Sequence, residues 1–101
     1  MVTVIVSDVD DENSPGQPDE WFADLVALKG DQSVLATVGL LGPEILTGCP
    51  PLVEPCPLLR AYVDEHLLDN RATLNICSPS TPDLEAAVGR VWQAICPEAG
   101  R

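Results

Sequence analysis

Three short stretches of the chain are dense in β-branched and aliphatic residues, and they predict buried strands at residues 2–7, 33–41 and 72–77. The first of them, Val2-Thr3-Val4-Ile5-Val6-Ser7, is nearly continuous, which is typical of a strand covered on both faces in a parallel sheet. Gly42 and Pro43 end the second stretch, and a proline-rich loop follows it.

Other stretches carry apolar residues at helical spacing. A first helix is predicted from Pro18 to Lys29, with Pro and two acids in its first turn and Gly30 as a left-handed cap. Its apolar side chains are expected to form one face, and they are Trp21, Phe22, Leu25, Val26 and Leu28.

Two further helices follow by the same criterion. The second begins near Pro57 and carries a stripe of Leu59, Val63 and Leu67, with Asn70 as its expected cap. The third begins at Thr81-Pro82-Asp83, and the tail from Pro97 is expected to fray. Its apolar stripe is Leu84, Val88, Val91, Trp92 and Ile95.

The predicted elements alternate in the order β-α-β-α-β-α along a single domain of residues 1–101. Such alternation predicts an α/β, three-layer, Rossmann-like fold, in which right-handed crossovers build a parallel sheet of three strands. Both edges of so small a sheet would present unpaired backbone groups unless another segment covers them.

The formal charge of −11, from 16 acidic and 5 basic residues, narrows the range of partners. Because a strongly negative domain repels phosphates and anionic headgroups, we expect no nucleic-acid partner and favour cations or basic proteins. No apolar run approaches the roughly 20 residues of a membrane helix, so no membrane insertion is expected.

Four cysteines set among prolines favour an oxidising compartment, whether extracellular, periplasmic or at the cell surface. No signal-peptide pattern follows Met1, so a signal for export would lie outside this chain.

Candidate chemistry lies directly after the first strand, where Asp8, Asp10, Asp11 and Glu12 are crowded together. Ligands of open α/β sheets bind at the carboxyl ends of the strands, and carboxylates suit Mg²⁺, Ca²⁺ or Mn²⁺. The alternative is a solvated acidic loop without a metal, and the spacing alone leaves both interpretations open.

Several segments resemble a von Willebrand factor A domain of the bacterial surface-protein or lipoprotein variety. Residues 2–16 resemble the fourth strand of that family and the loop after it. The aromatic-rich helix at residues 21–25, the Gly42-Pro43 strand end and the segment Asn75-Ile76-Cys77-Ser78 agree with its later elements. The resemblance covers nearly the whole chain but only the second half of the family's fold.

The resemblance implies a protein-binding or adhesion module rather than an enzyme, with part of a metal-ion-dependent adhesion site. Asp8 matches the metal-binding Asp after the family's fourth strand, and Asp10 and Asp11 are the next candidate ligands. The chain has no upstream Asp-x-Ser-x-Ser pattern, and Asn13 stands where the bacterial variety is expected to carry Cys. The chain alone should therefore hold a divalent cation (Mg, Mn or Ca) weakly or not at all. Its partner would be a protein ligand or the missing N-terminal half of the domain.

The predicted elements place three of the four cysteines at one edge of the sheet. Cys49, Cys56 and Cys77 should lie at the carboxyl ends of the strands, whereas Cys96 ends a helix that runs about 21 Å back along the sheet. We predict a disulfide between Cys77 and Cys49, with Cys56 as the second choice and Cys96 free or paired outside this chain. The family resemblance also favours a bridge between these two regions.

Two enzyme-like or signalling families give weaker matches. The strand followed by Asp8-Val9-Asp10 resembles the first motif of Mg-dependent haloacid-dehalogenase-type phosphatases, in which the first Asp is the nucleophile and the second a general acid. No Ser or Thr ends the second strand, however, and Lys29 is the only lysine. Receiver domains share the Asp10-Asp11 pair but need an acceptor Asp and a Lys that this chain lacks.

A metal-independent structural or interaction module is the remaining alternative. In the von Willebrand factor A fold the first strand lies beside the fourth, so its absence would leave residues 2–7 as an open edge. Self-association through that edge is a further expectation. His66, the only histidine, is expected to lie within the second helix beside its apolar stripe, in an exposed or partly buried structural role.

Overall fold

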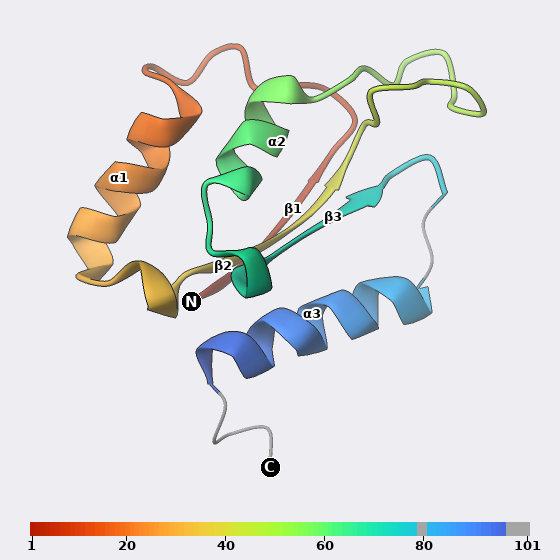
Figure 1. Cartoon of the computed structure of the whole chain (residues 1–101). Coiled ribbons are helices and arrows are strands. Elements are labelled where there is room, and N and C mark those ends of the chain that lie inside the picture. Colours follow the sequence, from red (N-terminus) through yellow and green to blue (C-terminus); the bar gives the residue numbers. More distant parts are fainter. Residues whose placement is uncertain (79–80, 97–101) are drawn as a thin grey trace.

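The computed structural model describes residues 1–78 and 81–96 of the chain. Its centre is a three-stranded parallel sheet in the order β1-β2-β3 (Figure 1). The strands span Val2–Ser7 (β1), Ala36–Leu41 (β2) and Arg71–Asn75 (β3). The sheet therefore has the parallel order that the alternating sequence pattern predicts.

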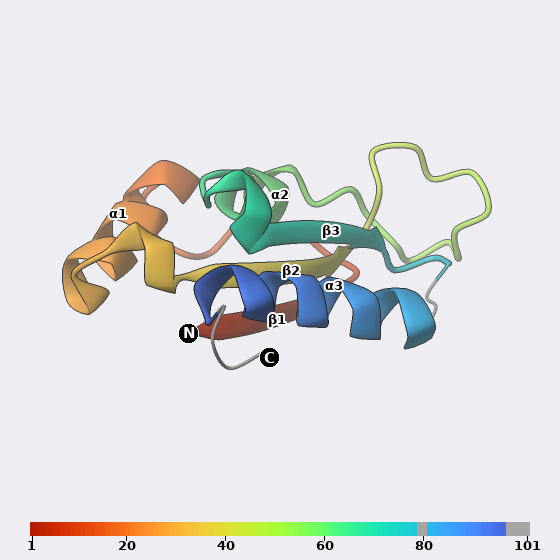
Figure 2. The same cartoon turned by 60° about the horizontal axis from the view of Figure 1, so that its bottom comes forward.

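Three α-helices connect and flank these strands. They are α1 (Pro18–Lys29), α2 (Pro57–Asp64) and α3 (Thr81–Ile95), and two short 3-10 helices, η1 (Gln32–Val34) and η2 (Leu68–Asn70), precede β2 and β3. The crossover helices α1 and α2 lie on one side of the sheet and α3 on the other (Figure 2). The arrangement confirms the predicted α/β class.

Alternation along the strands divides the core between the two faces of the sheet. On the α3 side, Ala36, Val38 and Ala72 pack against Ala87 and Val91 of the helix. On the α2 side, Leu41 packs with Cys56 and Val63, and partly buried Ile5, Leu59 and Tyr62 join them. Only a small set of apolar side chains is fully buried, so much apolar surface is left at the periphery.

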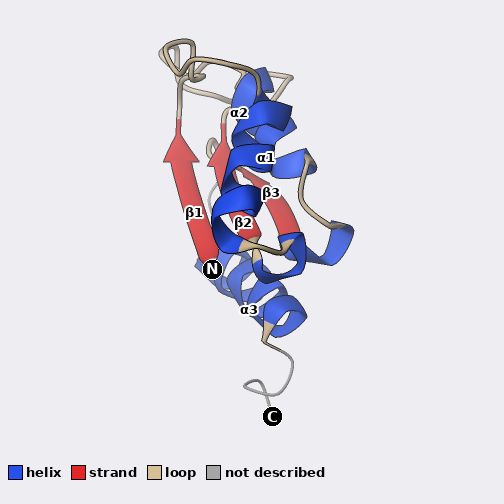
Figure 3. Ribbon diagram, turned by 90° about the vertical axis from the view of Figure 1, so that its left-hand side faces the viewer, coloured by secondary structure: helices blue, strands red, loops and turns tan. Residues whose placement is uncertain are grey.

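Strand β1 differs from the prediction of a strand covered on both faces. Val4 is 46% exposed and Val6 is 60% exposed, because α3 packs mainly on β2 and β3. On the opposite side, α2 packs on β2 and β3 and its core reaches β1 at Ile5, whereas α1 packs on α2, so that β1 lies to one side of both helices (Figure 3). The apolar run at residues 2–7 thus marks a strand of which only one edge is paired.

Helix α1 also buries less of its apolar face than the spacing predicts. Phe22 is buried, but Leu28 is 77% exposed, since α1 packs on α2 more than on the sheet. The helix ends as predicted at Gly30, whose φ of 87° is left-handed and whose backbone N–H donates to the Val26 carbonyl.

Helix α2 is shorter than predicted. The helix ends at Asp64, so Leu67 lies outside it and is exposed. Asn70 does not cap the helix, because it ends η2 as a buried residue whose Nδ2 donates to the carbonyls of Ser33 and Leu35. It thereby ties the start of β3 to the start of β2.

Candidate functional site

The acidic loop lies at the carboxyl end of β1, beside the return of the proline-rich loop. The Glu54 backbone N–H donates to the Asp8 carbonyl at 2.8 Å, which holds the two loops together. Gly42 has no Cβ at this crossing, where one would lie 1.8 Å from the Glu54 carbonyl oxygen. The edge of the sheet that the sequence predicts as the ligand site, at the carboxyl ends of the strands, is therefore a closely packed junction of two loops.

Asp10 is used within this junction as a cap for α2. Its two carboxylate oxygens accept from the backbone N–H groups of Leu58 and Leu59, each at 3.1 Å. These are donors at the start of the helix, which have no partner within the helix itself. A carboxylate there also interacts favourably with the positive end of the helix dipole. Asp10 thus has a structural role that joins β1 to α2.

Asp11 organises the loop itself. Its carboxylate accepts from the Ser14 hydroxyl at 2.5 Å and from the backbone N–H groups of Ser14 and Asn13 at 2.9 and 3.1 Å. The Ser14 hydroxyl, followed by the Ser14 backbone N–H, lowers the pKa of Asp11 below its ordinary value. Asp11 is therefore a turn residue as well as a candidate ligand.

Asp8 is the remaining candidate ligand. Within residues 1–78 and 81–96 its carboxylate makes no hydrogen bond, unlike those of Asp10 and Asp11. No group of three or more His, Cys, Asp or Glu side chains in the described ranges is arranged to hold a metal ion. The metal-site hypothesis stays a prediction, and Asp8 is the residue to test it with.

The disulfide joins Cys49 to Cys77, with their Cα atoms 5.1 Å apart, which confirms the first predicted pairing. Cys56, the second choice, is a free buried thiol at the start of α2, and Cys96 is free within the described part of the chain. Burial raises the pKa of Cys56 above its ordinary value. The bridge fixes the long loop after β2 to the end of β3.

His66 has a structural role, but it follows α2 rather than lying within it, and it is buried rather than exposed or partly buried as the sequence predicts. The ring is buried, and its Nδ1 lies 3.2 Å from the carbonyl oxygens of Tyr62 and Val63. Nδ1 therefore carries the proton, and the Thr37 hydroxyl donates to Nε2 at 2.9 Å. Burial lowers the pKa of His66, which favours the neutral form of the ring.

The outer edge of β1 is left uncovered by these contacts. Its segment Val2–Ser7 carries no charged side chain, and Val4 and Val6 are exposed on the α3 side. Arg90 of α3 reaches the Arg71 carbonyl on β3, so the opposite flank of α3, which carries Val88 and Trp92, is turned toward β1. We call β1 with this flank the β1 edge.

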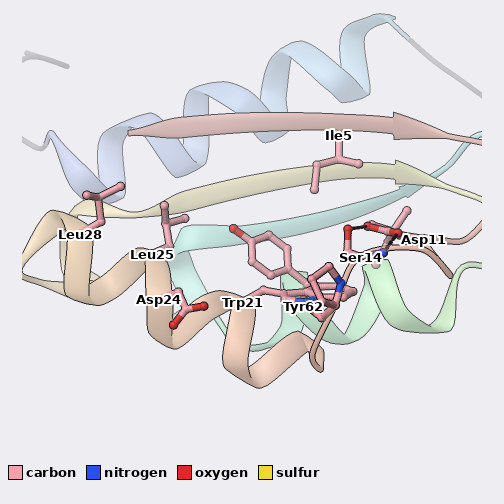
Figure 4. A pocket seen from close by; sticks show the side chains of 10 residues that line it. Ile5, Asp11, Ser14, Trp21, Asp24, Leu25, Leu28 and Tyr62 are labelled. Carbon is pink, nitrogen blue, oxygen red and sulfur yellow. Dashed lines mark hydrogen bonds between the residues drawn. The ribbon is translucent and has the colours of Figure 1, made fainter.

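A groove of about 560 Å³ lies on the other face of the sheet, between β1 and the helices α1 and α2. Figure 4 shows Ile5 on one side, Trp21, Asp24 and Leu25 on the other, and the Tyr62 ring between them. The sequence predicts the apolar residues but not the groove, because a helical stripe does not show that α1 stands away from β1.

Comparisons of the chain with protein-family models, with curated proteins and with solved structures found no match. The von Willebrand factor A resemblance therefore stays a prediction. Among the described helices, none combines the length and apolar character needed to cross a membrane.

Proposed function

We propose that the chain is a protein-binding module that accepts an extended segment of a partner along the β1 edge. The observation that carries the proposal is a six-residue strand, paired on one side by β2, with exposed Val4 and Val6. An added strand would satisfy the outer backbone groups of β1 and bury these valines.

Charge favours a different protein over a second copy of this chain as the partner. Each copy carries a formal charge of −11, so two copies repel one another, whereas a basic segment is attracted. The von Willebrand factor A resemblance supports the same edge, because that fold has another strand beside this one. The partner segment would then come from a protein ligand or from the N-terminal half of the domain.

A divalent cation at Asp8 is the second candidate, as an aid to binding in a longer protein. Its support is that the Asp8 carboxylate is not engaged with the described residues while those of Asp10 and Asp11 are. The phosphatase alternative is disfavoured, since Asp10, its general acid, has both oxygens on backbone N–H groups of α2. The Cys49–Cys77 disulfide supports an oxidising compartment, outside the cytoplasm, as the place of action.

The proposal is tested with a capped eight-residue peptide of alternating valine and threonine that carries one central glutamine, the glutamine peptide. Backbone amide shifts and hydrogen exchange of the protein are followed as the peptide is added. We expect slower exchange at amides of Val2–Ser7, because a new strand protects an edge. If these amides exchange at the same rate with saturating peptide, the β1 edge is not a strand-binding site.

Val6→Lys is the matched perturbation, since a lysine on an edge strand opposes pairing. Leu68→Lys is its control, because Leu68 is also exposed but lies at the start of η2. Only the first variant should weaken peptide binding. Light scattering over a range of concentrations tests copy-to-copy association at the same edge. The cation is tested by adding magnesium to the protein and to the Asp8→Ala variant and measuring the midpoint of thermal unfolding of each.

A further inference from the structure

The groove beside β1 combines apolar walls with an acidic rim. Ile5, Leu25 and Leu59 supply aliphatic surface, and the rings of Trp21 and Tyr62 lie with their centroids 6.3 Å apart. The Trp21 indole N–H donates to the Pro15 carbonyl at 2.7 Å, so the loop after β1 fixes this ring in place. The Trp21 part of the aromatic surface is thus held in position by this loop.

The charged groups at the groove are acids. Asp24 and Asp11 line it, and no Lys, Arg or His does so among the described residues. Asp11 is occupied by Ser14 and Asn13. Asp24 is exposed and makes no hydrogen bond within the described ranges. The groove therefore offers one unengaged carboxylate beside aromatic and aliphatic surface.

We propose that this groove receives a lysine or arginine side chain of the partner strand, an inference that rests on the proposed function. The aliphatic stem of such a side chain would lie against Ile5, Leu25 and Tyr62, and its cationic head would meet Asp24. Long basic side chains bury their stems on apolar surface and keep the charge at its rim. Aromatic faces and a carboxylate both attract a cation.

The placement follows from how β1 is used. Ile5 lies on the groove side of β1, whereas Val4 and Val6 lie on the α3 side. Side chains of an added strand alternate in the same way. A basic residue on the groove side and apolar residues on the α3 side would therefore distinguish a preferred partner from a generic extended segment.

The test compares the glutamine peptide with one in which the central glutamine is replaced by lysine and with one carrying glutamate there. Dissociation constants are measured by calorimetry at low ionic strength. We expect the lysine peptide to bind about fivefold to tenfold tighter than the glutamine peptide, and the glutamate peptide to bind weakest. Asp24→Asn should remove the preference for the lysine peptide and leave the dissociation constant of the glutamine peptide unchanged.

Asp19→Asn is the control, because Asp19 is an exposed acid on the same helix that does not line the groove. It should keep most of the lysine preference, which separates the groove from the general field of an acidic protein. Equal binding of the lysine and glutamine peptides, or an equal effect of both Asp variants, would overturn the inference and leave the strand-binding proposal standing. Failure of all three peptides to bind would overturn both.

Discussion

The sheet has two edge strands, β1 and β3, and they differ in the charged side chains beside them. Along β3, Arg71 reaches the carbonyls of Asp64 and His66 on one face, and Arg90 donates to the Arg71 carbonyl from α3 at 3.2 Å. Arginines therefore flank β3 from both sides of the sheet. Along β1, the segment Val2–Ser7 is uncharged, and two of its valines are exposed.

Charged side chains at a sheet edge are a common protection against unwanted strand pairing. Here β3 has that protection and β1 lacks it, although both belong to one small sheet. This asymmetry is what the proposed binding of a partner strand at the β1 edge requires. The two edges also differ in how their ends are held, by the Cys49–Cys77 bridge at β3 and by the Asp10 cap at β1.

Loss of the disulfide should have the largest effect, and on the β3 side. Cys49 and Cys77 are 28 residues apart, so the chain-entropy argument gives the bridge about 3 to 4 kcal/mol of stability. Urea unfolding of the Cys49→Ser/Cys77→Ser double variant measures the loss, and hydrogen exchange should rise first at residues 71–77. Cys96→Ser is the control, and an equal loss there would contradict this role of the bridge.

Acidification should lower stability without altering peptide binding at the β1 edge. The unfolded chain binds a proton on His66 below the ordinary pKa of 6.5, whereas the folded ring, whose pKa is lowered by burial, binds that proton only at a lower pH. The unfolded state then holds more protons, so stability falls as pH drops through 6.5, by at most about 1.4 kcal/mol per pH unit.

Urea unfolding at pH 7.5 and 5.5, with His66→Gln as the comparison, measures this loss. Residues 2–7 contain no ionisable side chain, so affinity for the glutamine peptide should stay constant while the protein remains folded. A pH slope that persists in His66→Gln would assign the effect to other groups.

Removing the cap at the β1 end should have a smaller effect. Asp10→Ala leaves the N–H groups of Leu58 and Leu59 without their acceptor, and loss of such a cap costs about 1 kcal/mol. Chemical denaturation measures the change, with Glu12→Ala as an exposed acid from the same loop. A matching loss in both variants would mean that charge, rather than capping, is responsible.

The smallest effects on stability are expected at the edges themselves. Val6→Lys and Arg90→Ala each alter exposed surface, so each should change the free energy of unfolding by less than about 0.5 kcal/mol. Their effects on association should differ, since the first protects the open edge and the second removes protection from β3. A loss of several kcal/mol in Val6→Lys would show that Val6 is packed.

The sequence pattern predicts the alternation of elements, the parallel sheet and the Gly30 cap, because each depends on local spacing. It does not predict that α2 ends at Asp64 or that strand β2 begins at Ala36. Those boundaries are set by tertiary contacts, such as Asn70 binding the Ser33 and Leu35 carbonyls.

At the candidate site, too, the sequence predicts what depends on local spacing and does not predict what depends on tertiary contacts. The sequence locates the carboxylates at the end of β1, but their roles depend on which backbone N–H groups come near them. Nothing local to Asp10 indicates that it caps a helix 48 residues later. The sequence does not predict the groove either, because the groove depends on how far α1 lies from β1.

The position of Met1 matters for engineering. Its ammonium group donates to the Val34 carbonyl at 2.5 Å and its carbonyl accepts from Ala36, so it sits where β1 begins (Figure 1). A short segment fused ahead of Met1 could turn back along Val2–Ser7 as a tethered strand. Tethering sets a local concentration in the millimolar range, so even a weakly binding sequence would occupy the edge. A fusion of this kind would turn the domain into a self-blocked reporter that an incoming ligand must displace.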